Sequence, residues 1–396
     1  MDIFVTGLGC ISPLGFNTEQ NLARLRAEKD GLVRSEYLES AYKDKKFFGE
    51  VKMNTPTLLD QLDLADRKGL TRSDALAFAA FNEAVRHAQL KKEEIESVDT
   101  AFISASTVGG MCLTDELYRD ANLNTDTSEY TESYNCAAHT LRIVEEYQLK
   151  GISNTINTAC SSSANAVMMG MKLIRSGRVK RAVVGGVDSL AKYTVNGFNA
   201  LQILSDDKCR PFDKGRDGLN LGEGAAYLVL ESEEVCNDKV KFARVLGAGN
   251  TNDAYHTSSM SETADGVIAC IQAALSDAGL TQDKVDYINA HGTGTQNNDQ
   301  VELTGFRAVF EAIPPFSSTK SYTGHTLGAA GALEAIYSIL GLMHNEIYPS
   351  LRVSELIDGF NAQPVATYTS NTEINTVLSN SYGFGGNCTS LLFGRP

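Results

Sequence analysis

The stretch that decides the fold is residues 157–166, NTACSSSANA, which continues as VMMGMKLIRSG through residue 177. The residues just ahead of it, 152–157, read ISNTIN and are typical of a short strand. Apolar residues then recur at helical spacing from Ala164 until Gly177, a common helix stop. The pattern therefore predicts that Cys160 lies where a strand gives way to a helix.

The predicted position of Cys160 suits a nucleophile. The first turn of a helix presents unpaired N–H groups, whose partial positive charge favours a thiolate over a thiol. Cys160 is, however, one of eight cysteines, and a buried cysteine is usually a small apolar residue whose packing explains it. Position alone leaves the catalytic and the packing interpretations equally open.

Two histidine-bearing stretches lie downstream of Cys160. His291 lies in NAHGTGT, residues 289–295, and His325 lies in KSYTGHTLGAAGALEA, residues 320–335. A thiol nucleophile needs polar partners that the fold, rather than the sequence, brings close. Neither histidine has a further ligand at metal-binding spacing, so no metal site is predicted. Both lie in loops rich in Gly and Thr, and active-site residues of α/β proteins concentrate in such loops.

These three motifs, in this order, resemble those of the β-ketoacyl-acyl carrier protein synthases, and the resemblance extends over essentially the whole chain. It implies an α/β protein of the thiolase-like fold, with two similar halves in a layered αβαβα arrangement. The residues themselves also indicate α/β, because short apolar runs alternate with helical segments such as 74–90. The apolar runs are residues 3–6, 100–104, 153–157, 182–185 and 225–230.

The chain also repeats a short pattern. Residues 243–250, ARVLGAGN, echo residues 3–10, IFVTGLGC, and the helical run 328–342 follows a histidine loop much as the Cys160 helix follows its strand. We infer a duplicated α/β unit. The predicted N-terminal ketosynthase half, residues 1–240, carries the nucleophile, and the C-terminal half, residues 241–396, carries the two histidines.

The resemblance implies a decarboxylative Claisen condensation. Cys160 would accept an acyl group, and malonyl-acyl carrier protein would then lose carbon dioxide and attack that thioester, giving a 3-oxoacyl-acyl carrier protein. His291 and His325 would hydrogen-bond the malonyl thioester oxygen and stabilise the enolate. Lys320 and Glu334 match catalytic positions of the family and complete the predicted catalytic set.

Four further residues are predicted to bind substrate. Thr293 and Thr295 match hydroxyls that hydrogen-bond the phosphopantetheine arm, which arrives on the carrier protein, so no separate cofactor is expected. Phe384 lies in NSYGFGGNC, residues 380–388, which resembles a glycine-rich gate whose Phe384 N–H completes an oxyanion hole. Val108 is assigned to the acyl pocket, with plain core packing as the alternative.

The charge of the chain limits its partners. A net charge of −14 argues against nucleic-acid binding, which needs clustered cations. Acyl carrier proteins are acidic, so an acidic enzyme must offer them a local cationic patch, and the resemblance favours Arg67 and Lys68 over the lysines beside Asp44. No basic leader or membrane-length apolar run is apparent, and the cysteines are scattered, so we expect a cytoplasmic protein that spans no membrane.

The pathway stays open at this point. Fatty-acid-type elongation by a homodimer is the first interpretation, and an iterative polyene or polyketide ketosynthase, paired with a chain-length partner in a heterodimer, is the alternative. A non-catalytic chain-length partner would lack Cys160. A thiolase would carry a second cysteine near the C-terminal glycine loop; Cys388 lies there, but the full His325 motif favours the synthase.

Two departures from the family pattern limit these expectations. Asn387 and Cys388 replace the usual Thr-Asn pair after the gate glycines, which leaves the hydrogen bonding of the gate open. Residues 111–135 match the family poorly, so the length of the acyl chain is not predicted.

Overall fold

Strands from both ends of the chain form one long mixed sheet at the centre of the protein. The computed structural model describes residues 1–64, 69–125, 128, 130–236 and 238–396. Within them the strand order is β10-β9-β13-β14-β8-β1-β7-β6-β4-β5. The first half contributes β1 (Ile3–Ile11), β4 (Thr100–Ala105), β5 (Ser153–Ile156), β6 (Arg181–Asp188) and β7 (Gly224–Ser232). The second half contributes β8 (Ala243–Asn252), β9 (Tyr287–Asn289), β10 (Phe316–Ser317), β13 (Thr376–Tyr382) and β14 (Asn387–Gly394).

The two halves of the sheet have the same pairing pattern. In the first, β1 pairs antiparallel with β7 and β7 with β6, whereas β6, β4 and β5 run parallel. In the second, β8 pairs antiparallel with β14 and β14 with β13, whereas β13, β9 and β10 run parallel. The halves join through β1 and β8, where Phe4 and Val5 pair with Arg244 and Ala243. The inferred duplication is thus visible in the topology, although the boundary at residue 240 stays a prediction.

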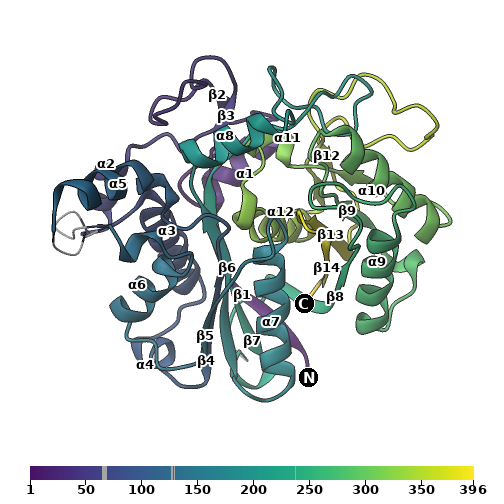
Figure 1. The fold of residues 1–396 in the computed structure, drawn as a ribbon. Helices are drawn as coiled ribbons and strands as arrows, with labels where there is room; N and C mark the ends of the chain where they lie inside the picture. The colour runs from purple at the N-terminus through teal and green to yellow at the C-terminus, as the bar shows by residue number, and fades with distance from the viewer. Residues whose placement is uncertain (65–68, 126–127, 129, 237) are drawn as a thin grey trace.

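Helices cover both faces of each half and fill the space between them (Figure 1). On the outer face of the first half, α3 (Arg72–His87) packs on β1 and β7 and contacts α6 (Ala138–Glu146). On the outer face of the second half, α9 (Asp265–Ala278) packs on β8 and β14 and contacts α10 (Gln296–Val309). Between the halves lie α7 (Ser162–Arg175) and α12 (Ala330–His344), which contact each other. The predicted layered αβαβα fold is therefore confirmed.

The repeated glycines have a packing role. A Cβ atom on Gly9 of β1 would lie 2.1 Å from the Ala80 carbonyl oxygen of α3. A Cβ atom on Gly249 of β8 would lie 2.2 Å from the Cys270 carbonyl oxygen of α9. Only glycine lets the outer helix approach its strand this closely, so the echo between residues 3–10 and 243–250 records the same helix contact made twice.

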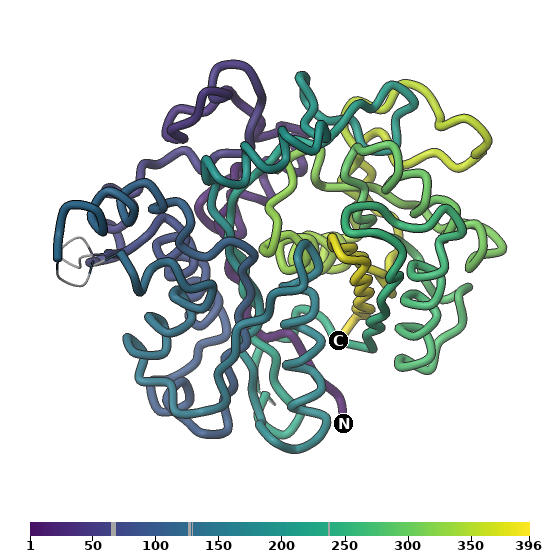
Figure 2. The backbone as a smooth tube through the Cα atoms, in the orientation of Figure 1, coloured from purple at the N-terminus to yellow at the C-terminus, as the bar shows by residue number. Residues whose placement is uncertain are grey.

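The remaining elements decorate this frame. The short pairs β2 (Leu32–Val33) with β3 (Phe48–Gly49) and β11 (Glu346–Ile347) with β12 (Thr369–Ser370) form two small sheets. The other helices are α1 (Thr18–Arg26), α2 (Thr55–Gln61), α4 (Lys92–Ile95), α5 (Thr114–Leu123), α8 (Lys192–Ala200) and α11 (Lys320–Thr323). Single 3₁₀ turns lie at η1 (Met111–Leu113), η2 (Glu132–Tyr134), η3 (Glu233–Val235), η4 (Gln282–Lys284) and η5 (Leu327–Ala329). The backbone trace separates the halves by colour, purple to teal on one side and green to yellow on the other (Figure 2).

Two sequence expectations need adjustment. The helix predicted at 74–90 begins at Arg72, because Thr71 and Asp74 form a capping box, and it ends before Gln89, which adopts a left-handed φ of 53°. The segment Leu327–His344 is apolar and long enough to cross a membrane, contrary to the expectation that no stretch would be. Of its residues, 89% are buried inside the fold, as expected for a central core helix.

Candidate active site

The predicted site residues follow the carboxyl ends of parallel strands. Cys160 follows β5, His291 follows β9, Lys320 follows β10 and Phe384 follows β13, while His325 comes from the turn between α11 and η5. In α/β sheets, ligands bind outside the carboxyl ends of the strands. The two halves point these ends at a common place, so residues more than a hundred positions apart meet there.

One cavity of about 450 Å³ brings most of these residues together. Cys160, His291 and His325 line it, and so do Thr293, Thr295 and Phe384. The amide side chains of Gln296, Asn297 and Asn298 contribute to its polar wall. Among the residues that the structure describes, no group of three His, Cys, Asp or Glu side chains is placed to hold a metal ion. The cavity therefore brings a thiol, two imidazoles and several hydroxyl and amide groups together.

The backbone that leads from β5 to α7 is strained next to Cys160. It precedes the helix by two residues, and Ala159 before it adopts a left-handed φ of 54°, which is uncommon for a residue with a Cβ. Its side chain is buried, and burial raises the pKa of the thiol to about 12. The positive charge of Lys320 and the backbone N–H of Phe384 act in the opposite direction. Contrary to the expectation of a thiolate, the protonated thiol predominates at neutral pH.

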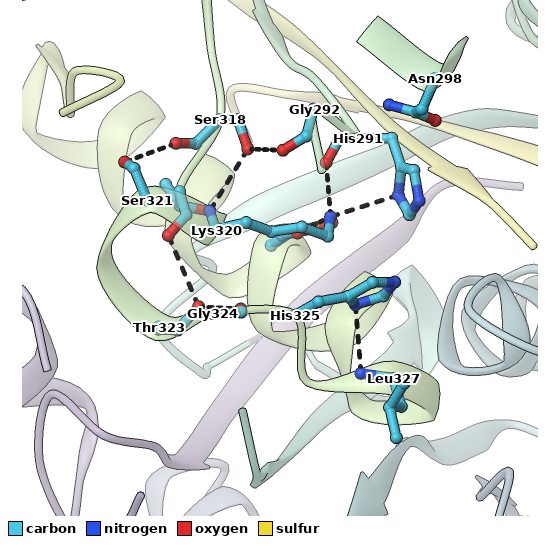
Figure 3. A network of polar contacts seen from close by, with 12 residues as sticks. His291, Gly292, Asn298, Ser318, Lys320, Ser321, Thr323, Gly324, His325 and Leu327 are labelled. Atoms are coloured by element: carbon cyan, nitrogen blue, oxygen red, sulfur yellow. Dashed lines mark hydrogen bonds and ion pairs between the residues drawn. The ribbon is translucent and has the colours of Figure 1, made fainter. Parts of the chain in front are cut away.

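The two histidines share one tautomer. Lys320 Nζ lies 3.2 Å from Nδ1 of His291, and the backbone N–H of Leu327 donates to Nδ1 of His325 at 3.2 Å (Figure 3). Each Nδ1 therefore accepts a hydrogen bond, which places the ring proton on Nε2. Burial and the nearby charge of Lys320 hold the pKa of both imidazoles well below its ordinary value. Both are neutral rings with an Nε2–H donor.

Lys320 is buried beside the histidines and has a carboxylate partner. Its ammonium forms an ion pair with Glu334 and donates to the carbonyl oxygen of His291 at 2.7 Å. The exposed fractions of the Lys320 and Glu334 side chains are 2% and 4%. Burial raises the pKa of Glu334 to about 7, against the effect of Lys320. Lys320 thus links Glu334 to His291, and the His325 ring lies beside that of His291 with centroids 5.4 Å apart, while Cys160 lines the same cavity.

Thr293, Thr295 and Phe384 are placed as predicted, although their roles stay predictions. The two threonine hydroxyls lie 2.9 Å apart and line the cavity. The Phe384 ring stacks on Phe198 of α8, with centroids 5.6 Å apart, and closes one side of the same cavity. Gly385 and Gly386 beside it both have φ near 85°, a conformation that suits glycine. A bulky ring on such a loop can close over a bound acyl group.

The other predicted residues lie elsewhere. Val108 is buried but is not among the residues that line this cavity; its backbone N–H donates to Asp188 at 3.2 Å. Its assignment to an acyl pocket stays a prediction. Arg67 and Lys68 lie outside the described residues.

Two residues outside the predicted set of site residues shape the loops around the cavity. Glu302 accepts the backbone N–H groups of His291 and Gly292, each at 2.8 Å, and so holds the first histidine loop. Arg216 is buried and donates to the Thr295 carbonyl oxygen at 3.3 Å. A charged, glycine-rich run such as residues 210–218 is more often a solvated turn, and the similarity of this passage to one near the family's site was the only signal for it.

Asn387 settles the hydrogen bonding that the sequence left open. Its Oδ1 accepts from Ser161 Oγ at 2.7 Å, from Asn165 Nδ2 at 2.9 Å and from Asn250 Nδ2 at 3.0 Å. These partners come from the start of α7 and from β8. The residue after the gate glycines therefore ties the gate directly to the Cys160 helix.

Known proteins resemble the chain along its whole length. Residues 1–235 match the model of the β-ketoacyl synthase N-terminal domain, and residues 242–354 match that of the C-terminal domain. The chain is 34% identical over 417 residues to 3-oxoacyl-[acyl-carrier-protein] synthase 2 of Rhizobium meliloti, and 31% identical over 414 residues to the Coxiella burnetii protein of that name. Each alignment covers 99% of this chain and 98% of the relative. Among solved structures, the ishigamide ketosynthase/chain length factor matches with a TM-score of 0.92 and 30% identity, covering 100% of this chain and 99% of that one.

Proposed function

The chain belongs to the β-ketoacyl synthase family, and we propose that it condenses an acyl group held on Cys160 with malonyl-acyl carrier protein. The product is a 3-oxoacyl-acyl carrier protein, as in fatty-acid chain elongation. The names of the relatives support a carrier-bound substrate. The observation that carries the proposal is the meeting of one thiol and two neutral imidazoles, all with fixed partners, in one cavity.

The first half-reaction transfers the acyl group. The Cys160 sulfur attacks the thioester carbon of acyl-carrier, the bond from that carbon to the carrier sulfur breaks, and the proton of the Cys160 thiol passes to the departing carrier thiolate. The backbone N–H groups of Cys160 and Phe384 would stabilise the tetrahedral oxyanion. The positive charge of Lys320 favours the developing thiolate.

The second half-reaction makes the carbon–carbon bond. The carboxylate of malonyl-carrier leaves as carbon dioxide. The electron pair of the broken carbon–carbon bond stays on the carrier-bound fragment, which becomes an enolate. Nε2–H of His291 and Nε2–H of His325 are the donors for the enolate oxygen, since each ring accepts at Nδ1. The enolate carbon then attacks the acyl carbon on Cys160, and the released thiolate takes a proton from water.

An iterative polyene or polyketide ketosynthase is the second candidate. It uses the same residues and differs in how often the product returns to Cys160. The similarity to the ishigamide ketosynthase/chain length factor, at 30% identity over the whole chain, favours it. Chain-length analysis of products made with excess malonyl-carrier separates the candidates, because an iterative enzyme releases products extended by several units.

Assembly through the free edge of the sheet is part of the proposal. Within the described residues β5 is the last strand of the sheet, and Ser153 and Asn154 on it are exposed. An open strand edge is a template for pairing with another chain. A second copy of this chain is the expected partner, with a heterodimer as the alternative.

We expect the protein in the cytoplasm, because all eight cysteines are unpaired.

Carrier docking is proposed at Arg67 and Lys68. Both cations precede helix α3, which begins at Arg72, and the resemblance to the family is what favours them. Reversing both charges should raise KM for acyl-carrier, because rim charges steer encounter. KM for a small acyl thioester without the protein should stay unchanged, and an equal rise for both substrates would argue against this docking surface.

The proposal is tested by separating the half-reactions. Intact-mass measurement after incubation with acyl-carrier reports acyl transfer, and release of labelled carbon dioxide from malonyl-carrier reports decarboxylation. Cys160→Ala should abolish acylation, with Cys236→Ala as a matched buried control that retains it. His291→Ala or His325→Ala should still be acylated but lose decarboxylation about a hundredfold to a thousandfold. Undiminished acylation of Cys160→Ala would refute the assignment of the nucleophile.

A further inference from the structure

Asp188 is a fully buried carboxylate that the proposed reaction steps do not use. It is the last residue of β6 and has an exposed fraction of 0%. Its Oδ1 accepts from Ser106 Oγ at 2.7 Å and from the Val108 N–H at 3.2 Å. Its Oδ2 accepts from Thr107 Oγ1 at 2.6 Å. Asp188 thus holds the whole loop after β4 through three consecutive residues.

The same carboxylate also holds the second histidine loop. Asp188 Oδ2 accepts the backbone N–H of Gly328 at 2.6 Å. A Cβ atom on Gly328 would lie 2.8 Å from this oxygen, so the contact requires glycine. The residue before it, Leu327, adopts a left-handed φ of 53°, and its own N–H donates to Nδ1 of His325 at 3.2 Å. Two hydrogen bonds, joined by the peptide between Leu327 and Gly328, therefore link Asp188 to the His325 imidazole.

The conformation of Leu327 needs an external hold. A bulky residue with a left-handed φ costs about 1–3 kcal/mol and persists only where its surroundings over-determine it. The Asp188 to Gly328 hydrogen bond fixes the peptide that follows Leu327, and burial of the Leu327 side chain fixes the rest. If this turn relaxed, the Leu327 N–H would leave Nδ1 and the His325 ring would lose both its orientation and its tautomer preference.

We propose that Asp188 is a positioning residue that fixes His325 through Gly328 and Leu327 and locks it to the loop after β4. The proposal rests on the proposed function of His325 as an enolate donor. In each of the hydrogen bonds described above, Asp188 is the acceptor, and both of its carboxylate oxygens face N–H or O–H donors. An asparagine at this position places an NH₂ group against hydrogen-bond donors in either orientation of its amide.

The test is Asp188→Asn, assayed by the two half-reactions and by the ¹⁵N chemical shifts of His325. We expect decarboxylation to fall about a hundredfold, the cost of a misplacement of roughly 1 Å. Acylation of Cys160 should not fall, because the Asp188 charge raises the pKa of that thiol and its removal favours the thiolate. The His325 signals should change from one tautomer to a mixture. Glu231→Gln is the matched control, a buried carboxylate of β7 that pairs with Arg181 at the opposite end of β6. It should lose stability without changing the ratio of the half-reactions.

Thr107→Val keeps the proposal testable if Asp188→Asn fails to fold. It removes one donor to the same Oδ2, so a smaller shift in tautomer and in decarboxylation is expected, in the same direction. An unchanged His325 tautomer in either folded variant, or equal losses in both half-reactions, would overturn the proposal. The His325 tautomer can be measured without substrate. If the proposed function is wrong, the parent protein itself will not be acylated by acyl-carrier. If only this inference is wrong, the parent will react normally and the His325 tautomer will not change in the variants.

Discussion

Replacing Glu334 by glutamine removes the carboxylate that pairs with the buried Lys320 ammonium. With exposed fractions of 2% and 4%, neither side chain can recruit solvent easily. Removing one partner of a buried pair leaves an uncompensated charge and costs about 3–5 kcal/mol. Since a typical domain has about 5–15 kcal/mol of stability in total, Glu334→Gln should lower the urea midpoint strongly, with an unchanged m-value.

A double variant separates folding from chemistry. In Lys320→Met with Glu334→Leu, two apolar side chains of similar volume replace the pair, an exchange that is often neutral or stabilising. Its urea midpoint should return close to the parent value. Decarboxylation should stay low, because Nδ1 of His291 has lost the Lys320 donor that fixes its tautomer. A parental midpoint for Glu334→Gln, or restored decarboxylation in the double variant, would refute this reasoning.

Two pH effects follow from the buried histidines. Burial lowers the pKa of His139 to about 3, so the unfolded chain binds a proton below about pH 6.5 that the folded protein does not. The contribution of His139 is therefore complete above about pH 6.5 and is lost as pH falls, by about 2 kcal/mol at about pH 5. Urea unfolding of the parent and of His139→Gln, at about pH 5 and at about pH 7.5, measures this contribution. If the difference in unfolding free energy between the two proteins were the same at both pH values, the expectation would be wrong. Because burial and the charge of Lys320 lower the pKa of His291 and His325, the ¹⁵N shifts of both rings should stay those of neutral imidazole between about pH 8 and pH 6, and imidazolium shifts appearing near pH 6.5 would contradict this. A change in decarboxylation centred near pH 7 would instead report Glu334, whose pKa burial raises to about 7.

The proposed reacting groups could be chosen from local sequence. Cys160, His291 and His325 each lie in a short motif whose residue types suit the chemistry, and the structure brings all three to one cavity. The repeated pattern that contains Gly9 and Gly249 also correctly indicated a duplicated unit, because a close contact between a helix and a strand needs glycine in each repeat. These are properties that a few neighbouring residues determine by themselves.

The state of those groups was not predictable, because it depends on distant parts of the chain. The Cys160 thiol is protonated because side chains from both halves bury it, which the helix-start argument could not include. Asn387 interacts with Ser161 across 226 positions of sequence, and Asp188 with Gly328 across 140. Neither pair has a spacing that a motif could reveal.

The pairing of β1 with β8 has a consequence for how such a site can arise. Equivalent strands of the two repeats end at the same cavity: β5 leads to Cys160, and its counterpart β10 leads to Lys320. Two identical chains arranged in this way would have to supply every group twice. Because one continuous chain contains both repeats, each copy has been free to diverge, one toward a nucleophile and the other toward a cation and its imidazoles. Fusion of the repeats is what permits an asymmetric reaction inside a nearly symmetric frame.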